Sequence, residues 1–151
     1  METYRVGGRS VATAATSGHA SATLWNASTT KDIFLTELHF SVTTAGSANA
    51  VLRRATARGT AGSTVTPDID NATARTAAPV SGALLDLAAY TTQPTLDASE
   101  LDRWVTAAAI GAGKIWVFAE AIKIPQTAGM TIATSQAAAF PASDYSFVWR
   151  E

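Results

Sequence analysis

The clearest pattern along the chain is an alternation of apolar and polar positions with a period of two, which is typical of β-strands. The strongest example runs from Asp32 to Thr43. The alternation assigns one face to Phe34, Thr36, Leu38, Phe40 and Val42, and the other to Ile33, Leu35, Glu37, His39 and Ser41. It predicts a strand with one face in the core and the other partly exposed to water.

Further strands follow from β-branched and aromatic residues bounded by glycine and proline turns. The last third of the chain is the richest in them, with a turn at Pro125 to Gly129. Strands are expected at Ala22 to Asn26, Asn49 to Ala57, Lys114 to Ile124, Met130 to Ser135 and Asp144 to Trp149. About eight short strands indicate a sandwich or barrel and not a βαβ array.

Two segments admit a helix, so we expect at most one or two short helices. Ala83 to Tyr90 fits either a strand or a short helix. Asp97 followed by Glu100 resembles a capping box. Helical spacing then continues to Gly111 through Leu101, Trp104, Val105 and Ala108, although Thr106 and a strand interpretation of Arg103 to Ala107 argue against it.

The first 20 residues predict an N-terminal arm, and residues 21–151 a single β-sandwich domain. Gly7 and Gly8 are followed by small residues in which Val11 is the only large apolar side chain. Such a tract gains little burial energy to offset the entropy cost of ordering its backbone. Thr66 to Gly82, with two prolines, predicts a long surface connection.

The composition indicates a smooth, weakly charged exterior. Charged residues make up 15% of the chain against about 25% in a typical domain, whereas 32 alanines and 22 threonines are present. Such a surface is expected to be largely covered in an assembly. The net charge of -1 argues against nucleic acid and anionic membranes as partners, and no apolar run is long enough to span a bilayer.

Candidate catalytic and metal-binding motifs all fail on spacing, so we expect no enzyme, metal or cofactor. With no cysteine, thiolate chemistry is excluded. The glycines before Lys114 lack the remaining P-loop residues and predict a turn.

Glu37 and His39 could share a site, but a cross-strand polar pair is favoured. The Asp68 to Asn71 segment lacks the glycine and glutamate of a calcium loop, and no pair stands out among Asp86, Asp97, Glu100, Asp102 and Glu120.

Aromatic and basic residues are the remaining candidates for binding. Tryptophans on a sandwich face can stack sugars, but we expect at least three of Trp25, Trp104, Trp116 and Trp149 to fill the core. Arginines occur in two small groups, one on the arm and one near a turn that also includes Arg58. Ordinary solvation is the simpler explanation for them. The residues that could contact a partner are Tyr4, Arg5, Arg9, Arg53 and Arg54.

Two passages of the sequence share a pattern of strands and turns with another group of proteins. The first is GAGKIWVFAEAIKIPQTAGMTIAT with the closing DYSFVWRE, in which Ile122-Lys123-Ile124-Pro125 ends a strand before a small-residue loop. The second, NAVLRRATARGTAGSTVTP, spans Asn49 to Pro67. The passages cover about a third of the 151 residues, and they resemble accessory virion proteins of tailed bacteriophages. The resemblance implies a jelly-roll sandwich, often trimeric, attached to a phage head as a decoration or cement protein without an enzymatic site.

Together these observations predict an all-β, jelly-roll-like sandwich that stabilises a phage capsid through symmetric contacts. Its partners would be itself, as a homotrimer, and the major capsid protein. It would be made in the host cytoplasm and reside on the capsid surface of the virion. The arm would gain burial only on assembly. The alternative is a carbohydrate- or receptor-binding module of a tail fibre or spike that uses Trp25 or Trp104.

Overall fold

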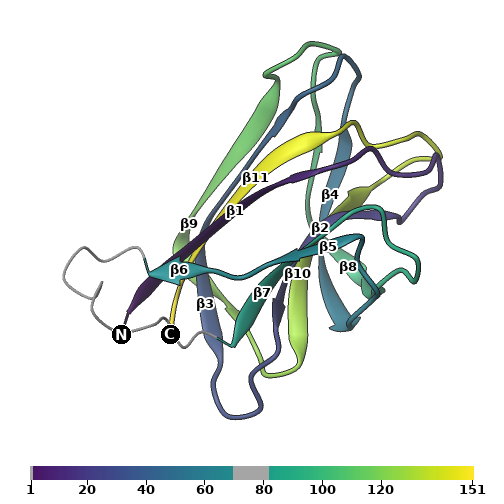
Figure 1. Cartoon of the computed structure of the whole chain (residues 1–151). Helices are drawn as coiled ribbons and strands as arrows, with labels where there is room; N and C mark the ends of the chain where they lie inside the picture. The colour runs from purple at the N-terminus through teal and green to yellow at the C-terminus, as the bar shows by residue number, and fades with distance from the viewer. Residues whose placement is uncertain (1, 70–81) are drawn as a thin grey trace.

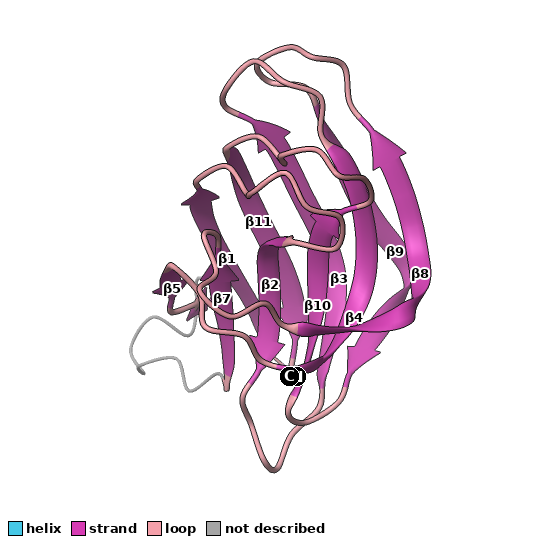
Figure 2. Cartoon of the chain, turned by 90° about the vertical axis from the view of Figure 1, so that its right-hand side faces the viewer, coloured by secondary structure: helices cyan, strands magenta, loops and turns pink. Residues whose placement is uncertain are grey.

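The computed structural model describes residues 2–69 and 82–151 and folds them into two antiparallel β-sheets packed face to face (Figures 1 and 2). No helix occurs in these two ranges. The long strands are β1 (Thr3–Ser10), β2 (Ala20–Asn26), β3 (Ile33–Val42), β4 (Asn49–Ala57), β8 (Thr95–Val105), β9 (Gly113–Ile124), β10 (Ala128–Thr134) and β11 (Ser143–Arg150). The short strands are β5 (Ser63–Val65), β6 (Asp68–Ile69) and β7 (Ala83–Leu87). The all-β prediction is confirmed.

The order of the eight long strands is that of a jelly roll. One sheet has the order β6-β1-β11-β3-β9 and the other β5-β7-β2-β10-β4-β8. Along the chain the long strands alternate between the sheets, except that β4 and β8 are neighbours in one sheet, and this produces two interleaved Greek keys. The short strands β5, β6 and β7 are insertions between β4 and β8. The sandwich therefore ends, on one side, in the two edge strands β8 and β9.

The core lies between the sheets and is rich in aromatic residues. Phe40 is central, with ring centroids 5.8 Å from Trp116 and 5.6 Å from Phe140. At the other end Tyr4 stacks on Trp149 at 5.8 Å. Because most small side chains here are alanine and threonine, these rings supply much of the buried apolar area.

The predicted arm is wrong for its first half, because Thr3–Ser10 forms a strand inside the sheet. Strand β1 pairs with β11 on one side and with β6 on the other. Tyr4 and Val6 are 4% and 3% exposed. The small residues serve close packing: a Cβ on Gly8 would lie 2.7 Å from Cδ1 of Leu87. The domain itself orders this segment, without a partner.

The predicted helix from Asp97 to Gly111 is also wrong, because β8 occupies Thr95–Val105. Its pairing with β4 shifts register three times. Each shift interrupts the two-residue alternation, so apolar positions three and four residues apart arise in a strand. The ambiguous segment after Gly82 is a strand, β7 (Ala83–Leu87). The predicted long connection falls mostly outside the described residues.

The strand predicted at Asp32 to Thr43 is confirmed as β3, but its faces are not those expected. The buried residues are Ile33, Leu35, Leu38, Phe40 and Val42. The alternation changes phase between Leu35 and Glu37, where the register with β9 and with β11 shifts. A β-bulge therefore moves the first two apolar residues of the strand onto the core face.

Candidate functional site

The predicted partner-contact residues of β1 differ in accessibility. Tyr4 is buried, its hydroxyl donates a hydrogen bond to Glu2, and burial raises its pKa to about 12. Its ring is therefore unavailable to a partner. Arg9 is exposed and donates two hydrogen bonds to the Asp144 carboxylate, of 2.6 and 2.9 Å. Arg5 is also exposed and lies on the same strand.

The side chains of Arg53 and Arg54 on β4 donate hydrogen bonds to the two edge strands, β8 and β9. Nε of Arg53 donates to the carbonyl oxygen of Asp97 on β8 at 2.6 Å. Nη1 of Arg54 donates to the carbonyl oxygen of Lys123 on β9 at 2.7 Å. The structure thus does not bring the five predicted residues into one patch, because the two pairs of arginines lie on different sheets.

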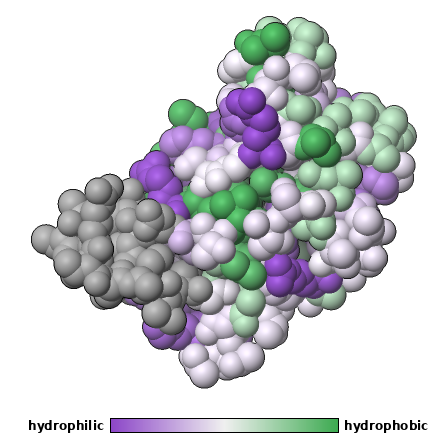
Figure 3. Space-filling model, in the orientation of Figure 1, coloured by the Kyte–Doolittle hydropathy of each residue, from purple (hydrophilic) through white to green (hydrophobic). Residues whose placement is uncertain are grey.

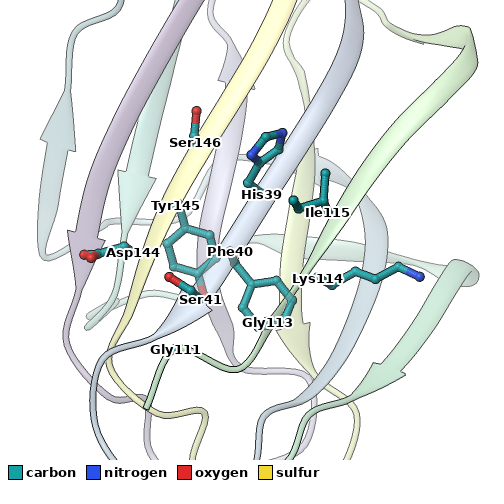
Figure 4. A pocket seen from close by; sticks show the side chains of 10 residues that line it. All are labelled: His39, Phe40, Ser41, Gly111, Gly113, Lys114, Ile115, Asp144, Tyr145 and Ser146. Carbon is teal, nitrogen blue, oxygen red and sulfur yellow. The ribbon is translucent and has the colours of Figure 1, made fainter. Parts of the chain in front are cut away.

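A shallow depression of about 650 Å³ lies on the outer face of the five-stranded sheet (Figure 4). Two cross-strand rows form it: Arg9–Asp144–Ser41–Gly113 and Gly7–Ser146–His39–Ile115. Half of the residues in these rows are serine or glycine, so the sheet surface is hollow beside the larger side chains of Arg9, His39 and Ile115. The ion pair with Arg9 closes one side, and its hydrogen bonds lower the pKa of Asp144. Lys114 extends away on the other side.

The depression lacks the arrangement that a hydrolase or a metal site needs. Nε2 of His39 lies 3.3 Å from Oε2 of Glu37 but makes no hydrogen bond. Ser146 is the cross-strand neighbour of His39, yet a serine nucleophile needs a hydrogen-bonded base. No group of three or more potential metal ligands occurs among the described residues. The expected Glu37–His39 polar pair is present, but within one strand instead of across two.

The most unusual surface is the edge formed by β8, β9 and the loop between them. Seven large hydrophobic residues are exposed in the described part of the chain, and six of them lie between Leu101 and Val117. They are Leu101, Trp104, Val105, Ile110, Ile115 and Val117, with 40% to 71% of their surface exposed. We call this set the β8–β9 edge. Figure 3 shows one face of the molecule, on which separate hydrophobic and hydrophilic patches lie within a surface of intermediate hydropathy.

Two side-chain contacts close the gap between the sheets at this edge. The indole Nε1 of Trp116 on β9 donates a hydrogen bond to Asp102 on β8. This bond lowers the pKa of the Asp102 carboxyl. The ammonium of Lys114 lies 3.8 Å from the ring centroid of Trp104, which is a cation–π contact. These two contacts join the edge strands β8 and β9 across the gap between the sheets.

The β8–β9 edge was not predicted as a site, although the sequence contains a signal for it. In β9, Trp116 and Phe118 alternate with Ile115 and Val117, so both faces are apolar. That pattern normally indicates a strand buried on both sides. Only the topology reveals that this strand lies at an edge, where one apolar face has no covering layer.

Two other predictions from the sequence are confirmed, one about the tryptophans and one about the glycines before Lys114. Trp25, Trp116 and Trp149 are buried and Trp104 is partly exposed, as expected for at least three core tryptophans. The glycines before Lys114 form a tight turn: Gly111 has a φ of 86°, and a Cβ on Gly113 would lie 1.9 Å from the carbonyl oxygen of Phe40.

No helix of the described residues is long and apolar enough to cross a membrane. Comparisons with protein-family models, with curated proteins and with solved structures found no match to this chain.

Proposed function

We propose that this chain is a structural protein whose task is assembly, and that it decorates the capsid of a tailed bacteriophage through symmetric subunit contacts. The observation that carries the proposal is the concentration of exposed hydrophobic residues on the β8–β9 edge. Exposed hydrophobic side chains gathered on one part of a surface are typical of a protein–protein contact. Burying Ile110, Ile115 and Val117 would remove from water the side chains with the largest exposure.

The phage context rests on the sequence resemblance described above, together with the jelly-roll strand order. Its expected partners are other copies, as a homotrimer, and the major capsid protein on the virion surface. A decoration protein of this kind acts mechanically, so contacts repeated around a symmetry axis add avidity without a catalytic pocket.

Sedimentation of the purified chain, alone and mixed with empty capsids, tests the proposal. We expect a self-associated species that co-sediments with capsids. Ile110→Lys and Ile115→Lys on the β8–β9 edge should weaken this association, whereas Val11→Lys, at an exposed valine outside the edge, should not. A chain that stays monomeric and ignores capsids at every concentration contradicts the proposal.

The partial exposure of Trp104 favours, as a second candidate, a carbohydrate- or receptor-binding module of a tail fibre or spike. Trp25 is excluded from that role because it is buried, and Lys114 occupies one face of the Trp104 ring. Glycan-array binding that disappears in Trp104→Ala would support this candidate. Absence of any glycan binding would remove it.

A further inference from the structure

We propose that β9 of one copy pairs antiparallel with β9 of a second copy. The two-fold axis that relates the two copies passes midway between their Val117 residues. The proposal rests on the proposed assembly function and names one contact within the β8–β9 edge. A two-fold contact does not close a trimer, so in the proposed assembly it joins one homotrimer to the next. The partner is a second copy of this chain, and the contact is isologous because the same strand contributes both sides.

The first support is that β9 has a free edge. It pairs with β3 and with no other strand of the described residues. Every second residue of such a strand leaves its N–H and C=O groups without a ladder partner, and this recruits additional strands.

The second support is that the sequence of β9 is complementary to itself. When Val117 faces Val117 of the copy, Lys114 faces Glu120, Ile115 faces Ala119 and Trp116 faces Phe118. Each strand then offers one opposite-charge pair, one aliphatic pair and one aromatic pair, which are the combinations that stabilise neighbouring strands. The pairing also places Ile115 and Val117 of both copies side by side on the outer face of the joined sheet, which reduces the exposure of side chains that are 62% and 70% exposed in one copy.

Neighbouring registers lose this complementarity. A two-fold axis at Trp116 would place Lys114 opposite Phe118 and Glu120 opposite Ala112. An axis at Phe118 would place Lys114 opposite Ile122 and Glu120 opposite Trp116. Each leaves both charges facing apolar side chains, so the axis at Val117 is the preferred register.

Cross-linking tests the register directly, because the natural chain contains no cysteine. Val117→Cys should give a covalent dimer with a short bis-maleimide. Ile115→Cys and Ala119→Cys should each give little dimer alone and much more when mixed. Val105→Cys, also exposed but on β8, is the matched control and should cross-link poorly. Equal cross-linking at residues 105 and 117 would overturn the proposed register.

Charge exchange tests the same contact without a cross-linker. Glu120→Lys places Lys opposite Lys, and Lys114→Glu places Glu opposite Glu, so each variant alone should self-associate roughly tenfold more weakly. A mixture of the two should restore association as heterodimers, because every facing pair is again of opposite charge. Circular dichroism of each variant establishes that it folds.

The outcomes separate this contact from the assembly function. Self-association that neither charge change affects, or a trimer without Val117 cross-links, overturns the β9 pairing and leaves the proposed function standing. A monomer that also fails to bind capsids overturns both, and it would mean that the register shift of β9 protects the edge. A Val117-linked dimer with charge rescue supports the contact even if capsids are not bound.

Discussion

Strands β2 and β9 invert the usual relation between side-chain polarity and burial. Every residue of β2 is buried, including the polar Ser21, Thr23 and Asn26. Strand β9 is longer and more apolar, yet it leaves Ile115 and Val117 largely exposed. The position of a strand in the sheet decides its burial here, and its composition does not.

The reason lies in what covers each strand. Strand β2 lies between β7 and β10, and the segment after β7 runs alongside it, with Gln93 accepting a hydrogen bond from the Ala20 N–H. Its polar groups find partners inside the protein: the Thr23 and Thr131 hydroxyls are 2.9 Å apart, and the Asn26 amide donates to the Lys31 carbonyl oxygen. Such partners offset the cost of burying polar groups. Among the residues that the structure describes, strand β9 has a neighbouring strand on one side only.

The largest expected effect comes from removing a buried apolar side chain from the covered strand. Leu24→Ala in β2, where Leu24 is 0% exposed, should lower the free energy of unfolding by about 2–5 kcal/mol. Val117→Ala in β9 should change it by less than about 0.5 kcal/mol for the monomer, because the side chain is already in water. Urea unfolding at low protein concentration measures both. Similar losses for the two variants would contradict the contrast between the strands.

The next prediction compares the stability that is lost when a buried ion pair is broken with the loss for an exposed pair. Asp86, 1% exposed in β7 beside β2, accepts two hydrogen bonds from Arg58 and one from the Thr64 hydroxyl. Asp86→Asn should therefore cost about 2–3 kcal/mol of stability, since Arg58 loses its countercharge.

The matched control is Asp144→Asn, which removes the ion pair with the exposed Arg9 on the outer face. Its side chain is 45% exposed and that of Arg9 68%. Water already screens this pair, so the cost should stay below about 1 kcal/mol. A larger loss for Asp144→Asn than for Asp86→Asn would show that burial does not determine the strength of these pairs.

The sequence predicted the architecture better than the connections. The sequence pattern, made of alternation and of β-branched and aromatic runs between turns, located the strands now seen as β2, β3, β4, β9, β10 and β11. It failed for β8, where register shifts mimic helical spacing, and for β1, where glycines fit the close approach of Leu87. Both failures come from long-range pairing, which local composition does not encode.

The candidate site was harder to predict than the fold. Arg53 and Arg54 look like a basic patch in sequence, but each is committed to a backbone carbonyl of an edge strand. Ile115 looks like a core residue, but it faces outward. Whether a residue is available to a partner depends on which strand lies next to it, and that order requires the completed sandwich.

The smallest effect concerns the contact that joins the two edge strands. The hydrogen bond from Trp116 lowers the pKa of Asp102 below its ordinary value of 3.8. A carboxyl with a lowered pKa in the folded state stabilises the protein above its unfolded pKa, and this contribution is lost as the pH falls through the folded pKa. Asp102→Asn should therefore flatten the decline in stability below about pH 4, as followed by urea midpoints, and leave an Asp144-dependent part of the decline in place. Because the carboxyl lies at the edge, where water competes for it, the change should be smaller than that of Asp86→Asn. An unchanged pH profile would mean that β8 and β9 are held together by their neighbours β4 and β3 alone.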